Sequence, residues 1–182
     1  MKLYEVTQRE PQLIHQFTAI WEDSVRTTHL FLSEAEIQKI KAYVPHALTG
    51  VSHLLVAERA QGQPVAFMGL EGPRLEMLFL SPAERGAGLG RQLLEYGILH
   101  YDLQELTVNE QNPQAAGFYE RMGFRTAGRD ATDPSGRPYP ILHMELGHAP
   151  HTGLVPIPSL LIDRIDIDFR AEVPGTDTEK QP

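Results

Sequence analysis

Apolar side chains recur every three or four residues in several long segments of the chain, which is the spacing of amphipathic helices. This pattern predicts helices over residues 11 to about 26, 33–44, 89–99 and 113–122. In the second of these segments, Ser33 and Glu36 have the spacing of a capping box at the helix start. Pro45 is expected to end that helix, because proline cannot continue a helix interior.

Shorter apolar or alternating runs, separated by glycine, proline and polar residues, predict strands. They cover residues 2–7, 53–57, 65–70, 75–80, 103–108, 124–129 and 141–146. Gln61 and Gly62 predict a tight turn that joins two of these strands in a hairpin. The mixed order of strands and helices predicts a single α/β (α+β) domain over residues 1–147.

Residues 148–182 differ in character from the rest of the chain. Four prolines interrupt the segment, residues 160–169 alternate apolar and charged side chains, and residues 175–182 are polar. We predict an appendage whose strand-like centre pairs with a sheet edge of this chain or of a partner subunit, or stays loose. A homodimer formed through such pairing is one hypothesis.

Composition narrows the function. Of the 182 residues, 41% are hydrophobic and 22% are charged, which is typical of a soluble globular protein. The absence of cysteine excludes disulfides, thiolate metal sites and cysteine nucleophiles, and no histidine pair has the spacing of a metal site. The first residues lack a long apolar run, so we expect neither a signal peptide nor a membrane span there. We therefore expect a cytoplasmic protein. The net charge of −8 disfavours nucleic-acid binding and favours a cationic or neutral small ligand.

A glycine-rich turn, residues 85–91 (Arg-Gly-Ala-Gly-Leu-Gly-Arg), lies between a predicted strand and a predicted helix. Backbone N–H groups in such a turn can converge on an anion, helped by the helix start and by Arg85 and Arg91. Alternatively, the glycines serve only the turn geometry. A nucleoside-triphosphate loop would continue with Lys and Ser or Thr, whereas Arg91 and Gln92 follow here. A dinucleotide-binding loop would lie at the start of a repeated strand–helix–strand unit, with an acidic residue about twenty positions further on. Glu110 lies at roughly that distance, but here the loop follows a hairpin instead of a first strand.

Two motifs carry a family resemblance. Arg85, Gly88 and Gly90 fit the Arg/Gln-x-x-Gly-x-Gly/Ala signature of the GNAT acetyltransferases, in the same strand-to-helix setting. Residues 108–124 resemble the second GNAT motif, in which an Asn opens a helix and a Tyr precedes a Gly-Phe strand. The resemblance covers residues 1–146, and its details are similar to the bacterial YjaB-like acetyltransferases. It implies a GNAT fold, with a mixed, bent central sheet of about seven strands flanked by helices on both faces.

The resemblance also implies acetyl-CoA as cosubstrate. The backbone of the strand before the turn would pair with the pantetheine arm, the turn would hold the pyrophosphate, and Asn112 would bond to the arm. Asn112 can also be read as a simple helix N-cap. The expected cofactor-binding residues are Leu78, Phe79, Leu80, Arg85, Gly86, Ala87, Gly88, Leu89, Gly90, Arg91 and Asn112.

Catalytic roles follow from the same motifs. Tyr119 is expected to be the general acid that protonates the leaving thiolate. Several relatives carry a carboxylate base where this chain has Thr107, which cannot serve. Two other residues are candidates for the general base. Glu76 is expected on the same strand face as Leu78 and Leu80, and His29 has an ordinary pKa suited to proton transfer. The simpler interpretations are that Glu76 is an exposed surface residue and that His29 bonds only to its neighbours.

The expected acceptor-binding residues are Trp21, His29, Phe31 and Tyr139. The leading hypothesis is an N-acetyltransferase that moves an acetyl group to a primary amine by direct attack in a ternary complex. The alternative is a non-catalytic acyl-CoA-binding or regulatory module. The sequence does not distinguish among a polyamine, an antibiotic, an amino acid and a protein amine as acceptor.

Overall fold

The computed structural model describes residues 1–147 and 166–167. Its helices are α1 (Pro11–Thr28), α2 (Glu34–Lys41), α3 (Val44–Gly50), α4 (Leu89–Tyr101) and α5 (Pro113–Arg121), with a 3₁₀ turn at Pro82–Glu84. Its strands are β1 (Lys2–Glu5), β2 (His53–Glu58), β3 (Pro64–Glu71), β4 (Arg74–Leu80), β5 (Glu105–Asn109), β6 (Phe124–Asp130), β7 (Ile141–Leu146) and β8 (Asp166–Ile167).

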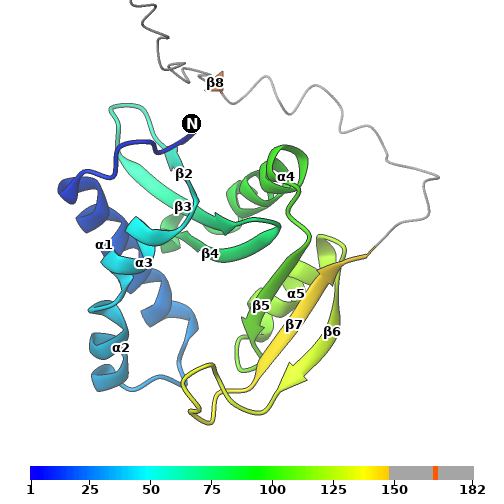
Figure 1. Ribbon diagram of the computed structural model, residues 1–182. Helices are drawn as coiled ribbons and strands as arrows, with labels where there is room; N and C mark the ends of the chain where they lie inside the picture. The colour runs from blue at the N-terminus through cyan, green and yellow to red at the C-terminus, as the bar shows by residue number, and fades with distance from the viewer. Residues whose placement is uncertain (148–165, 168–182) are drawn as a thin grey trace, which may run out of the picture.

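The strands form one mixed sheet in the order β6-β7-β5-β4-β3-β2-β1-β8. Neighbouring strands are antiparallel except for the parallel pairs β4–β5 and β1–β8. Helices α1 to α3 pack on one face of the sheet, and α4 and α5 pack on the other (Figure 1). The expected mixed sheet of about seven strands with helices on both faces is confirmed.

Each face of the sheet has its own apolar core. On the α1 side, Phe17 packs against Phe67 of β3 with ring centroids 5.1 Å apart. On the α4 side, Leu93 and Leu94 lie in one cluster with Phe124 of β6. Because both faces are covered, β3 is buried along nearly its whole length, as a central strand must be.

Most predicted helices and strands are present, but the structure differs from the prediction at Pro45. The capping box of Ser33 and Glu36 is confirmed, but Pro45 does not simply end a helix, because it lies in the first turn of α3. Proline is well tolerated there, since its missing N–H would have no partner in any case. The strand predicted over residues 160–169 lies outside the described residues except for β8, which pairs with Lys2 and Leu3 of β1.

Strand β4 has two irregularities that shape the molecule. It pairs with β5 only through Arg74 and Leu75, and beyond these residues the two strands diverge (Figure 1). Its pairing with β3 shifts by one residue, so that Glu76 is the extra residue of a β-bulge. Because of the bulge, Leu75 packs in the same core as Leu78, although simple alternation would place the two on opposite faces.

Candidate active site

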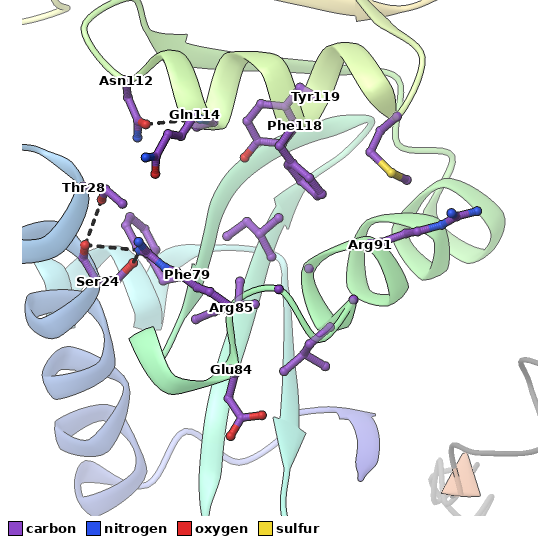
Figure 2. Close-up of a pocket in the computed structure, with 18 of the residues that line it drawn as sticks. Ser24, Thr28, Phe79, Glu84, Arg85, Arg91, Asn112, Gln114, Phe118 and Tyr119 are labelled. Atoms are coloured by element: carbon purple, nitrogen blue, oxygen red, sulfur yellow. Dashed lines mark hydrogen bonds between the residues drawn. The ribbon is translucent and has the colours of Figure 1, made fainter.

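A cavity of about 830 Å³ lies between the diverging strands, the glycine-rich turn, α5 and the end of α1 (Figure 2). It brings together most of the predicted site residues. Those that line it are His29, Leu78, Phe79, Leu80, Arg85, Gly86, Gly88, Leu89, Gly90, Arg91, Asn112 and Tyr119. Among its other lining residues are Ser24, Thr28, Glu84, Gln114 and Phe118.

The glycine-rich turn presents a row of free backbone donors. Gly86 and Gly88 have φ angles of 78° and 84°, which residues with a Cβ rarely adopt, and Gly88 caps α4 without a side-chain bond. The N–H groups of residues 86–91 donate to no other residue in the described part of the chain. A Cβ added at Gly86 or Gly88 would meet nothing within 4 Å. Together with the helix start, this open cradle of donors fits a phosphate group.

The edge of β4 supplies unpaired backbone beside the cradle. Leu78, Phe79 and Leu80 pair with β3 on one side, but β5 has diverged from them on the other. Their free backbone groups can hydrogen-bond an extended chain laid along the edge, as a further strand would. The pantetheine arm of coenzyme A is such a chain, so the fit to this group extends from the turn to the strand.

Asn112 lies across the cavity at the start of α5. Its Oδ1 accepts from the backbone N–H of Ala115 at 3.2 Å, so the interpretation as an N-cap is confirmed. The side chain is nevertheless part of the cavity wall, and its NH₂ group has no partner among the described residues. One amide can therefore cap the helix with its oxygen and offer its nitrogen to a ligand.

Tyr119 reaches the cavity from the buried side of α5. Its ring packs between Phe118 and Phe124, with centroid distances of 5.2 and 6.1 Å. The hydroxyl has no hydrogen-bond partner within residues 1–147, and Figure 2 shows it directed into the cavity. Burial raises the pKa of Tyr119 above its ordinary value of 10, so the phenol keeps its proton at neutral pH. The geometry suits a proton donor.

His29 lines the cavity from the end of α1, next to a set of polar contacts. Its Nδ1 lies 2.9 Å from Oγ1 of Thr28, and that hydroxyl lies 2.8 Å from the carbonyl oxygen of Ser24. Arg85 donates to Oγ of Ser24 at 3.0 Å. Burial, and then the positive charge of Arg85, lower the pKa of His29 below 6.5, so the ring is neutral at pH 7.

Comparison with known proteins identifies the family. A family model described as an acetyltransferase (GNAT) domain matches residues 19–136. This chain belongs to the GNAT acetyltransferases. It is 42% identical over 126 residues to the peptidyl-lysine N-acetyltransferase YjaB of Salmonella typhimurium, covering 69% of this chain and 86% of the relative. The Escherichia coli protein of the same name is 40% identical over 133 residues, covering 71% and 87%.

The solution structure of apo YjaB from Escherichia coli superposes on this GNAT chain with a TM-score of 0.73. The two are 36% identical over 81% of this chain and 98% of that structure. The chain is thus an N-acetyltransferase, and acetyl-CoA is its cosubstrate. No helix in the described ranges is long and apolar enough to cross a membrane.

Five predicted residues of this GNAT enzyme lie outside the cavity wall. Trp21 is buried in the α1 core against Phe79. Glu76 is exposed and pairs with Arg74 at 3.2 Å. The remaining three are Ala87, Phe31 and Tyr139.

Ser24 and Thr28 also line the cavity, although neither was predicted individually as a site residue. Their spacing was a signal, because two hydroxyl residues four positions apart fall on one face of a helix, here the mostly apolar face of α1.

Proposed function

We propose that this enzyme acetylates primary amines, with the lysine side chains of peptides as its acceptor class, by direct attack in a ternary complex. The observation that carries the proposal is the 40–42% identity to two relatives whose names give peptidyl-lysine as acceptor. The net charge of −8 agrees with a cationic acceptor. Because the chain has no cysteine, it cannot pass the acetyl group through a cysteine thioester, which supports direct transfer.

Bound acetyl-CoA supplies an acetyl group activated as a thioester. In the proposed complex, the N–H groups of residues 86–91 hold the pyrophosphate. The free edge of β4 at Leu78–Leu80 binds the arm, and the side-chain NH₂ of Asn112 donates to the arm from the opposite wall. These contacts would hold the thioester in the cavity that His29 and Tyr119 line.

Proton transfer divides between two side chains in this proposal. An ammonium acceptor must lose two protons to become an amide. Nε2 of His29 takes the first and releases it to solvent, because this ring is neutral and lines the cavity, whereas Glu76 does not line it. Tyr119 gives its phenolic proton to the leaving sulfur, and the second proton of the amine restores the phenol through water.

The acceptor would enter beside an aromatic cluster that starts at His29. The rings of His29 and Phe31 are 5.4 Å apart, and those of Phe31 and Tyr139 are 5.6 Å apart. The Tyr139 hydroxyl donates to Glu36, which ties the loop before β7 to the start of α2. This cluster borders the His29 end of the cavity, where a peptide carrying the lysine would lie.

The test is thiol release from acetyl-CoA with lysine-containing peptides, free lysine, polyamines and aminoglycosides. We expect turnover with the peptides, and a loss of about 10²–10⁴-fold in kcat for Tyr119→Phe with coenzyme A binding retained. Tyr101→Phe is the matched control, since Tyr101 donates to Glu5 and is not part of the cavity wall. An unchanged rate in Tyr119→Phe would remove the general acid, and turnover with polyamines or aminoglycosides only would remove the acceptor class.

A further inference from the structure

The last turn of α1 carries a chain of hydrogen bonds that ends at the ring of His29. Thr28 Oγ1 lies 2.8 Å from the carbonyl oxygen of Ser24 and 2.9 Å from Nδ1 of His29. Arg85 Nη2 approaches the same carbonyl at 3.4 Å and Oγ of Ser24 at 3.0 Å (Figure 2). The hydrogen bonds thus run from Arg85 through Ser24 and Thr28 to Nδ1 of His29.

The contacts of Thr28 fix where the hydrogens lie. A hydroxyl has one hydrogen, and a carbonyl oxygen can only accept. The single hydrogen of Thr28 is therefore donated to Ser24, and its oxygen must accept in the contact with His29. That contact requires a hydrogen on Nδ1, so the neutral ring carries its proton on Nδ1 and a lone pair on Nε2.

The surroundings of His29 favour the neutral ring and leave Nε2 open. Arg85 is the charged group that acts on the ring, and Phe31 packs against it with centroids 5.4 Å apart. Beyond Phe31 lie Tyr139 and its carboxylate partner Glu36, which is also held by Ser33. No residue of the described chain bonds to Nε2, and His29 belongs to the cavity wall. Nε2 is thus the nitrogen left for a ligand.

We infer that Thr28 is a positioning residue that holds His29 as the Nδ1–H tautomer and so presents an unprotonated Nε2 to the acceptor amine. The catalytic half of this inference rests on the proposed function. The tautomer itself does not, because it is a property of the protein without substrate. In the transfer, Nε2 takes one proton from the acceptor ammonium and the ring becomes an imidazolium, which then returns that proton to solvent.

The first experiment reads the tautomer in the full chain without acetyl-CoA, by long-range ¹H–¹⁵N NMR of the histidine rings at pH 8, with His29→Gln to assign the signal. We expect a protonated Nδ1 in the wild type and in Thr28→Ser, which keeps the hydroxyl. Thr28→Val keeps the branched shape but removes the acceptor, and Nδ1 should lose most of its proton. A wild-type signal with Nε2 protonated would overturn the inference whether or not the enzyme is active, and whether or not the valine variant folds.

The second experiment measures turnover with the best peptide acceptor. Loss of one ordinary hydrogen bond shifts a two-state equilibrium by roughly five- to tenfold, so kcat of Thr28→Val should fall by about that factor. The KM for acetyl-CoA should stay unchanged, and Thr28→Ser should retain most of the activity. Wild-type activity in Thr28→Val despite a changed tautomer would overturn the catalytic half. Inactivity of all proteins toward every amine would contradict the proposed function instead, while leaving the NMR result to decide the tautomer.

Discussion

Replacing Gly88 by alanine should separate two effects of the glycine-rich turn, backbone strain and loss of the phosphate cradle. Gly88 has φ = 84°, and a Cβ there would meet no atom within 4 Å. The substitution therefore causes no clash and adds only the cost of a left-handed backbone, about 1–2 kcal/mol. For a domain of this size that corresponds to a melting temperature lower by roughly 2–8 °C.

Gly62 provides the matched control. It has φ = 75°, also has nothing within 4 Å of an added Cβ, and lies in the β2–β3 turn, away from the cavity. Gly62→Ala should therefore lose a similar amount of stability. Only Gly88→Ala places a methyl group among the N–H donors of residues 86–91, where hydrogen bonds to a charged phosphate contribute about 1.5–3 kcal/mol. Its affinity for coenzyme A should fall by roughly tenfold to a hundredfold.

The assay is isothermal titration of coenzyme A into both variants, with melting curves to confirm equal folding. Equal affinity of the two variants would refute the assignment of the pyrophosphate to the turn. A melting temperature for Gly88→Ala far below that of Gly62→Ala would show instead that the turn carries packing beyond the contacts described above.

Three further predictions follow from the site. The pKa of His29 is below 6.5 in the folded protein, so its contribution to the free energy of unfolding is full above pH 6.5 and is lost as the pH falls through the lowered pKa. The melting temperature of the wild type should therefore drop more steeply on acidification than that of His29→Gln. Asn112→Ala should lower the free energy of unfolding by about 1 kcal/mol and weaken coenzyme A binding. Asn112→Asp should keep the helix cap but still bind coenzyme A less tightly, and melting curves and calorimetry measure the two effects. Trp21→Ala should lose about 3–5 kcal/mol in denaturant unfolding, and the milder Trp21→Phe should keep the KM for the acceptor peptide, because Trp21 packs in the core.

Features set by a local pattern could be predicted from the sequence. The capping box at Ser33 depends on two residues three positions apart, and the start of α4 depends on the glycines that precede it. The site residues on the glycine-rich turn and on α5 lie in such local motifs, and the structure brings Gly88, Asn112 and Tyr119 to one cavity. Local sequence fixes these positions because each motif shapes its own backbone.

Features set by distant contacts could not be predicted in this way. The bulge at Glu76 arises from the register between β4 and β3, which the sequence of β4 alone does not contain. Trp21 belongs to an apolar stripe on α1, but the pattern does not say that Phe79 covers it. The role of Thr28 depends on Ser24, one helical turn earlier, and on a histidine outside the helix, so helix periodicity alone does not reveal it.

The divergence of β4 from β5 has a consequence for the cooperativity of the whole domain. The backbone ladder between the β1–β4 part and the β5–β7 part of the sheet consists of two residue pairs, so few main-chain bonds couple local opening on one side to the other. A cosubstrate that bonds to β4 on one side and to Asn112 on the other adds the missing coupling. Slow hydrogen exchange should then spread across both parts when coenzyme A binds, which makes the ligand part of the cooperative folding unit.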